Sequence, residues 1–192
     1  MRLSSSRLLD LSLGSVGLFL SLPGGLAVAL AIRFLDGGPV LFRQQRIGQL
    51  GRPFDLLKFR TMRATGGALA TETAPASRLG TFLRRFHIDE LPQLINVLRG
   101  EMSLVGPRPE RPELVQLFAA QLPDYPRRHQ LRPGITGWAQ VNTGDGVSLE
   151  ETRVKLTFDL EYLQNRSLGL DLAILLRTVQ VVLFGFRSPR VQ

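Results

Sequence analysis

The feature that most constrains this chain is an uncharged, apolar run of 22 residues from position 11 to position 32. As a straight helix this run would be roughly 33 Å long at about 1.5 Å per residue, which matches the thickness of a bilayer core. Three structures would explain the apolar run: a cleaved signal peptide, a transmembrane helix, or a helix that enters the bilayer, breaks and leaves by the same face. The run alone does not choose among them.

A break lies in the middle of the run, at Pro23-Gly24-Gly25. Proline lacks an amide proton and clashes with the preceding turn, so it kinks a helix. Arg2 and Arg7 precede the run and Arg33 follows it, and positive charge on both flanks favours keeping both ends in the cytoplasm. Residues 29–31 (Ala-Leu-Ala) also resemble a signal-peptidase site. The residues therefore favour a re-entrant helix only slightly over a cleaved signal.

Composition narrows the remaining chemistry. The chain has 192 residues, enough for one domain, and it contains no cysteine. A disulfide framework, a thiolate zinc site and a cysteine nucleophile are therefore excluded. The formal net charge is +8, which indicates a polyanionic partner: a nucleic acid, an anionic membrane surface or a phosphorylated substrate.

The remaining pattern predicts an α+β, mostly helical fold with one small β-hairpin. Two prolines hold residues 106–109 extended. The last helix is strongly apolar but carries three polar residues, so it is expected to lie in the membrane interface or on the protein rather than to cross a bilayer. The expected elements are a hairpin over 40–59, a mobile surface loop over 64–77, and helices over 78–85, 89–98, 113–122, 149–163 and 168–186.

The sharpest chemical motif is the segment 87–93, which contains Asp89, Glu90 and Pro92. A proline three residues after Asp89 fits only the first turn of a helix, so Asp89 is predicted to be a helix N-cap. Capping alone would account for the motif. The alternative is chemical: a carboxylate held ionised at a helix terminus, beside bound phosphate and a divalent cation, is a suitable nucleophile at phosphorus.

Two further segments present cations. Arg108 projects from a proline-stiffened loop, which suits bidentate binding of phosphate oxygens. Lys58 and Arg60 end a predicted strand, and their side chains are expected to point to opposite faces. Each segment taken alone is more simply explained as solvated surface residues.

These segments belong to a series of long motifs that follow one another along the chain. They are Gly38–Phe42 with Gln45–Gly48, Lys58–Met62, Asp89–Gly100, Met102–Pro109 and Arg132–Asn142, together with Pro23 in the apolar run and Lys155, Asp159 and Tyr162 in one helix. In this order and spacing the chain resembles the bacterial monotopic phosphoglycosyl transferases. These single-domain enzymes begin glycan assembly on a polyprenol phosphate.

The resemblance implies a UDP-sugar donor, a polyprenol (undecaprenyl) phosphate acceptor, Mg²⁺ and a covalent aspartyl-phosphosugar intermediate. It implies a re-entrant membrane helix over 1–36 broken at Leu22-Pro23, and a catalytic domain over 37–192. The location it implies is the cytoplasmic face of the bacterial inner membrane, in contact with membrane lipid, and a homodimer is left open. The resemblance implies that Asp89 is the nucleophile, that Glu90 helps to hold magnesium or assists the acceptor, and that Asp89 and Glu90 are the metal ligands. The other roles carried over are Lys58, Arg60, Arg84 and Arg108 as phosphate ligands, and Glu113, Arg132, Gln140 and Asn142 as nucleotide-sugar ligands.

Two positions depart from the family pattern. The helix break reads Leu22-Pro23 where the family commonly has Ser-Pro, and the stretch after Asn142 reads 143–146 (Thr-Gly-Asp-Gly) where the family commonly continues Gly-Arg. The first departure removes a hydroxyl that could bond a freed backbone carbonyl. The second removes a cation from the loop expected to contact the UDP-sugar.

Two other classes of protein share some of these features. A nucleic-acid-binding module would explain the charge, but the basic residues are scattered among turns without interleaved aromatic residues, so no nucleic-acid partner is expected. A secreted binding domain with a cleaved signal would explain the apolar amino terminus.

Overall fold

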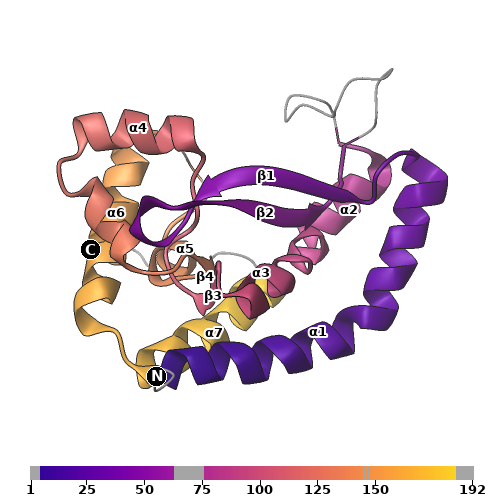
Figure 1. Ribbon diagram of the computed structural model, residues 1–192, viewed down its shortest axis with the longest axis horizontal. Coiled ribbons are helices and arrows are strands. Elements are labelled where there is room, and N and C mark those ends of the chain that lie inside the picture. The colour runs from indigo at the N-terminus through magenta and orange to yellow at the C-terminus, as the bar shows by residue number, and fades with distance from the viewer. Residues whose placement is uncertain (1–4, 63–75, 145, 147, 185–192) are drawn as a thin grey trace.

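The computed structural model describes residues 5–62, 76–144, 146 and 148–184 (Figure 1). The predicted mobile loop over 64–77 lies almost entirely outside these residues, as does part of the 143–146 turn. In chain order the elements are α1 (Ser5–Ala31), β1 (Leu41–Ile47), β2 (Pro53–Phe59), α2 (Arg78–Arg85), α3 (Gln93–Arg99), β3 (Ser103–Val105), α4 (Pro112–Gln121), β4 (Gly134–Thr136), α5 (Trp138–Asn142), α6 (Leu149–Asn165) and α7 (Leu168–Phe184). Shorter helical turns cover Ile32–Asp36, Gln49–Gly51, Ile88–Glu90 and Tyr125–Gln130.

The described residues form two small sheets. β1 and β2 pair antiparallel with Leu41 opposite Phe59 and Ile47 opposite Pro53, which confirms the predicted hairpin. β3 and β4 pair in parallel, with Ser103 opposite Gly134, and this second sheet was not predicted from the sequence. Each of its strands has only three residues, too few for a periodic pattern to show.

Helix α1 is bent, and both of its ends lie against the rest of the protein. The helix contains Pro23, and Figure 1 shows two straight limbs, one along the lower edge of the view and one along its right side. At the start, Arg7 donates to the carbonyl oxygens of Val97 and Leu98, at 2.6 and 2.8 Å. Following the helix, the Asp36 carboxylate accepts from Ser77 Oγ at 2.7 Å.

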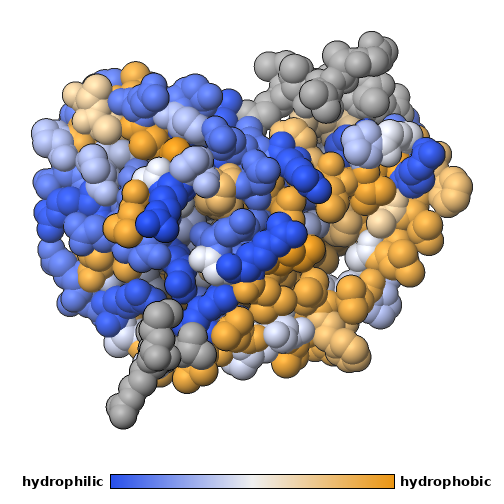
Figure 2. Space-filling model, in the orientation of Figure 1, coloured by the Kyte–Doolittle hydropathy of each residue, from blue (hydrophilic) through white to orange (hydrophobic). Residues whose placement is uncertain are grey.

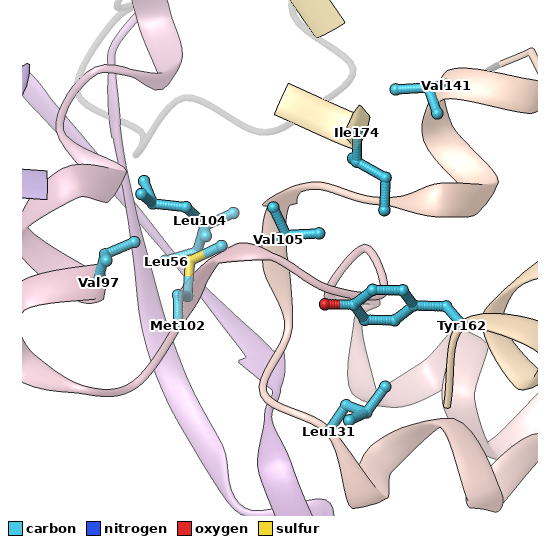
Figure 3. Packing of buried hydrophobic residues seen from close by; sticks show 9 residues of the cluster. All are labelled: Leu56, Val97, Met102, Leu104, Val105, Leu131, Val141, Tyr162 and Ile174. Atoms are coloured by element: carbon cyan, nitrogen blue, oxygen red, sulfur yellow. The ribbon is translucent and has the colours of Figure 1, made fainter. Parts of the chain in front are cut away.

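The main core lies between the hairpin, the second sheet and the carboxyl-terminal helices. Figure 3 shows its nine buried members, which come from β2, α3, β3, α5, α6, α7 and the connecting segments. Val97, Met102 and Ile174 are fully buried, and Leu56 brings the hairpin onto this cluster. The core therefore fixes the hairpin relative to α3, and the hairpin and the short turn just before α3 carry several residues of the candidate site.

Apolar side chains are also exposed in long rows on α1 and α7. Figure 2 shows them gathered along the lower and right edges of the molecule, over α1. The exposed residues on these two helices are Leu8, Leu13, Val16, Phe19, Leu20, Leu22, Leu26, Leu30, Leu168, Leu172, Leu176, Val179, Val182, Leu183 and Phe184. By length and composition, the described residues include one helix able to cross a membrane, Ser5–Asp36, and little of it is buried in the protein.

Helix α7 turns both apolar and polar residues toward the protein and carries a row of exposed apolar residues on its outer side. Asp171 is buried, where it accepts hydrogen bonds from Tyr162 and Ser6. Arg177 lies over the ring of Trp138. Two of the three polar residues that interrupt this apolar helix thus face the protein, whereas Gln180 is exposed on an otherwise mainly apolar outer face. Such a surface is typical of contact with lipid or with another protein.

Candidate active site

A polar cavity of about 500 Å³ lies where the hairpin meets α2 and the turn before α3. Its lining combines two acids with several cations, and it brings together five of the predicted site residues. The lining residues are Phe42, Gln44, Arg46, Lys58, Phe59, Thr61, Met62, Arg84, His87, Asp89, Glu90 and Arg108.

Asp89 sits in the short helical turn Ile88–Glu90 and is only 7% exposed. The prediction that Asp89 caps an α-helix is wrong, because α3 begins at Gln93 and Pro92 occupies its N-cap position. Proline is well suited to a helix start, where an amide proton has no intrahelical partner. Asp89 therefore lies one turn ahead of the helix, so helix capping does not account for its position.

The backbone just before Asp89 turns sharply. His87 has φ of 53° and ψ of 20°, in the left-handed region that non-glycine residues adopt infrequently. This conformation ends the approach from α2 and starts the turn that carries the two acids. The His87 amide, which donates to the Arg84 carbonyl at 3.2 Å, ties this bend to the end of α2.

Glu90 is paired with cations. Its Oε1 accepts from Lys58 Nζ at 2.6 Å and lies 4.0 Å from Arg108 Nη1. Burial acts to raise the pKa of Glu90, but the charges of Lys58 and Arg108 outweigh it and the pKa falls below its usual value. Glu90 is therefore ionised at neutral pH and joins cations from two separate elements.

Asp89 has a different electrostatic environment from its neighbour. Burial raises its pKa above the usual value, the charge of Lys58 lowers it, and the adjacent Glu90 raises it further. The environment of Asp89 therefore favours its ionised form less than solvent does for an exposed carboxyl group. A buried carboxylate with incomplete charge compensation favours the arrival of a further cation.

Two of the three arginines that line the cavity, Arg84 and Arg108, are held in different ways. Arg84, near the end of α2, donates from Nε to Thr61 Oγ1 at 2.8 Å. The Arg108 side chain remains 42% exposed, but its backbone is tightly fixed. Successive carbonyl oxygens of Pro107, Arg108, Pro109 and Glu110 accept, respectively, from the Gly134 amide, the Arg128 guanidinium, the Arg46 guanidinium and the Ile47 amide.

Among the residues that donate to the carbonyl oxygens of the Arg108 loop, Arg128 has a buried side chain. Its three guanidinium nitrogens donate to Asp159 at 2.8 Å, to the Tyr125 hydroxyl at 3.0 Å and to the Arg108 carbonyl at 3.0 Å. The buried charge of Arg128 is paired with Asp159, so the network is satisfied within the protein. A rigid support therefore lies directly behind the arginine that points into the cavity.

A second cavity of about 390 Å³ adjoins the first and is mainly apolar. It is bounded by α3, the β4–α5 segment and α7, and shares His87, Glu90 and Arg108 with the polar cavity. Its remaining lining residues are Phe86, Leu91, Leu94, Ile135, Thr136, Gln140, Val141, Thr143, Gly144, Thr178, Val181 and Val182.

A model of the family described as "Bacterial sugar transferase" matches residues 1–185 of the chain. The chain belongs to this family. The match covers the hairpin, the two acids and the arginine loop, so the candidate site lies within the family's own fold.

Curated relatives carry names that specify their substrates. The chain is 45% identical to a UDP-glucose:undecaprenyl-phosphate glucose-1-phosphate transferase of Caulobacter vibrioides, over 92% of this chain and 69% of the relative. It is 40% identical to a UDP-N-acetylgalactosamine-undecaprenyl-phosphate N-acetylgalactosaminephosphotransferase of Aeromonas hydrophila, over 93% of this chain and 43% of the relative. An Escherichia coli enzyme with the same name as the Caulobacter relative is 41% identical, over 88% of this chain and 38% of the relative. The matched region is thus between 38% and 69% of the length of these relatives.

The remaining predicted site residues of this bacterial sugar transferase lie apart from the polar cavity. Arg60 is 3% exposed and donates to the Asp36 carbonyl, so it fixes the end of the α1 segment. Burial raises the pKa of Asp10 in α1, and the positive charge of Arg132 acts against this larger rise. Gln140 lines the apolar cavity, and Asn142 donates to the Trp138 carbonyl within its own helix. Glu113 lines a separate surface pocket with Gln44, next to the hairpin.

Sequence reasoning missed several residues of the polar cavity, among them Phe42, Gln44, Arg46 and His87. The first three alternate along β1 and therefore point to one face of the strand. That alternation was available in the sequence once the hairpin was predicted. His87 carried no such signal, because its position depends on the left-handed turn.

The two acids can be tested as a magnesium site. The described residues contain no group of three or more His, Cys, Asp or Glu that could enclose a metal ion. Mg²⁺ does not need such a group, because it keeps several waters and is usually held by one or two carboxylates together with substrate phosphates. Asp89 and Glu90 share a cavity with the cationic side chains of Lys58, Arg84 and Arg108, so this pair fits Mg²⁺ that arrives with a phosphorylated ligand.

Proposed function

We propose that this protein transfers a sugar 1-phosphate from a UDP-sugar to a polyprenol phosphate, releasing UMP and forming a polyprenol diphosphate sugar. The observation that carries the proposal is the position of Asp89, a buried carboxylate in a cavity lined by Lys58, Arg84 and Arg108. The relatives' names specify both substrate classes, and the sugar that this chain uses is left open.

The first step forms a bond between an Asp89 carboxylate oxygen and the sugar-bearing phosphorus of the donor. The bond from that phosphorus to the bridging oxygen breaks, and UMP leaves with that oxygen. The products are UMP and an aspartyl-phosphosugar. Lys58, Arg84 and Arg108 offset the negative charge on the phosphate oxygens, which is the main requirement of phosphoryl transfer.

The second step uses the acceptor. An oxygen of the polyprenol phosphate attacks the same phosphorus, the acyl-phosphate bond breaks, and the Asp89 carboxylate is regenerated. Donor and acceptor thus react in turn at one carboxylate. Glu90 holds Lys58 and Arg108 in place throughout, because its charge lies beside both cations.

Mg²⁺ is the cofactor in this proposal, held by Asp89 and Glu90. Bound there, it supplies positive charge for the diphosphate and offsets the repulsion between the adjacent carboxylates. The raised pKa of Asp89 supports this role, since a nearby cation stabilises the ionised form that attacks phosphorus.

The proposed location is the cytoplasmic face of the bacterial inner membrane, with α1 entering and leaving the bilayer by that face. Support comes from the two ends of α1, which both contact the catalytic part of the protein, at Val97 and at Ser77. A helix that crossed the bilayer would carry one of these ends to the other side. The apolar outer rows of α1 and α7 supply the lipid contact.

The test is release of UMP from a panel of UDP-sugars with Mg²⁺ and a polyprenol phosphate. One donor is expected to give both UMP and a lipid-linked product, and Asp89→Asn is expected to abolish both, because an amide cannot form the acyl phosphate. Asp124→Asn is the matched control, since that acid is exposed and pairs with Arg127 away from the cavity. An active Asp89→Asn variant would contradict the proposed mechanism.

A further inference from the structure

The apolar cavity has one charged end. Leu91, Leu94, Ile135 and Val181 are among the residues that line its body, whereas His87, Glu90 and Arg108 line the side shared with the polar cavity. The ligand that fits such a space is an amphiphile with an anionic head beside Arg108 and a branched hydrocarbon tail. The volume of the cavity, about 390 Å³, suits a few isoprene units and not a whole polyprenol chain.

We propose that this cavity, between α3, β4–α5 and α7, binds the isoprene units next to the acceptor phosphate and selects the acceptor by their shape. The inference rests on the transfer reaction proposed above. With the chain held there, the acceptor phosphate lies at the shared side, next to the carboxylates of the polar cavity. The two cavities then hold the two substrates of one reaction, and neither substrate has to cross the other's site.

The surroundings of the cavity allow a lipid tail to reach it. Leu94 lines the cavity and also packs on α1, where a Cβ placed on Gly17 would lie 3.6 Å from its Cδ1. On the other wall, Val182 is 40% exposed and belongs to the apolar outer row of α7. One wall of the cavity is therefore α7 itself, and Leu94 of the opposite wall packs on α1, so the rest of the lipid chain can continue toward the exposed apolar rows of these helices and into the bilayer.

The competing occupant is the nucleoside of the donor. Gln140 lines the cavity, and its Oε1 is buried without a hydrogen-bond partner among the described residues, so it could accept from a uracil ring. The aliphatic character of the other walls favours the isoprenoid, because a uracil has polar edges that would be left unsatisfied there. An experiment that measures the acceptor and the donor separately decides between them.

The chain offers a matched pair of valines for this test. Val181 lines the cavity, whereas Val179, two residues earlier on α7, is exposed on the outer face. Val181→Phe fills part of the cavity, and Val181→Thr makes its wall polar with little change of shape. The acceptors are geranyl phosphate and farnesyl phosphate, which differ by one isoprene unit, and all assays use the full-length protein in detergent with Mg²⁺.

Wild-type protein is expected to have a KM for farnesyl phosphate at least tenfold below that for geranyl phosphate, because the added unit buries several methylene equivalents. Val181→Phe is expected to raise the KM for farnesyl phosphate roughly tenfold and to reduce this preference, and Val181→Thr is expected to raise it severalfold. Val179→Phe should leave both values unchanged, which excludes a general effect on detergent partition.

Exchange of labelled UMP into UDP-sugar without acceptor reports the donor half of the reaction, and it separates failure of the inference from failure of the proposed function. If exchange persists in both Val181 variants while their KM for farnesyl phosphate stays at the wild-type value, the inference is overturned and the function stands. A raised KM for UDP-sugar with an unchanged acceptor KM would assign the cavity to the nucleoside and also overturn it. Absence of exchange in the wild type would overturn the two-step function and the inference with it.

Discussion

At the scale of single residues, the two adjacent acids of the site have opposite electrostatic environments. The pKa of Glu90 is lowered by Lys58 and Arg108, which outweigh its burial, whereas the pKa of Asp89 is raised by burial and by Glu90 itself. Two neighbouring carboxylates with pKa values pushed apart have separate roles. Here Glu90 organises the cations, and Asp89 is the group that gains most from a ligand-borne cation.

Lys58 is the residue whose removal tests this division. Lys58→Met takes away a charge that lowers the pKa of both acids, so both pKa values should rise. The attacking group must be ionised, and activity should therefore be lost at higher pH than in the wild type as the pH is lowered. The pH profile of UMP release measures this. Lys155→Met is the control, because that lysine donates to the Gly146 carbonyl and does not line the polar cavity.

Arg108 is the second residue with a distinct expectation. Arg108→Ala removes a partly exposed guanidinium and leaves the hydrogen-bonded backbone of its loop in place. Loss of a charge-assisted phosphate contact costs roughly 1.5–3 kcal/mol, about a ten- to a hundredfold drop in kcat/KM for the donor. An unchanged rate, with an unchanged unfolding midpoint, would remove Arg108 from the phosphate site.

At the scale of elements, the bent helix α1 is attached to the protein by polar contacts near its start. The Asp10 side chain is buried, and its Oδ1 accepts from Ser103 Oγ at 2.9 Å and from the Leu104 amide at 2.8 Å. These bonds join the apolar helix α1 to strand β3, which precedes the Arg108 loop. The attachment therefore connects the position of α1 to the geometry of the site.

Asp10→Ala should weaken that attachment. Each buried donor left without an acceptor costs about 1–3 kcal/mol, and each kcal/mol lowers Tm by about 2–4 °C in a chain of this size. The measurement is thermal unfolding in detergent. Ser12→Ala serves as control, because its hydroxyl is exposed and bonds only within α1. A Tm equal to that of the wild type would show that these bonds do not hold the helix.

The helices and strands also differ in how far the sequence could predict them. Local patterns were sufficient for the hairpin and for α2, whose bounds match the prediction, since capping and alternation are local properties. The sequence could not predict the parallel β3–β4 pair or the electrostatic interaction of Arg132 with Asp10, because both depend on the arrangement of distant segments. For the same reason Lys58 could be proposed as a phosphate ligand, but its pairing with Glu90 could not be foreseen.

At the scale of the whole molecule, the account requires both ends of α1 to lie on one side of the membrane. The chain contains no cysteine, so single cysteines can be introduced without background. Ser5→Cys and Arg43→Cys place thiols at exposed positions, one at the first residue of α1 and one beyond its end in β1. In intact cells neither should react with a membrane-impermeant maleimide, and both should react after permeabilisation. Opposite labelling would mean that the helix crosses the bilayer.

The central claim is that Asp89 forms a covalent bond to the sugar-bearing phosphate, and the most direct measurement omits the acceptor. Wild-type protein is incubated with Mg²⁺ and a UDP-sugar labelled in the sugar, and peptides are analysed by mass spectrometry. The account predicts that the label becomes attached to the peptide containing Asp89, that UMP appears in about equal amount, and that Asp89→Asn gives neither. An adduct on Glu90, or turnover by the Asp89→Asn variant, would contradict it.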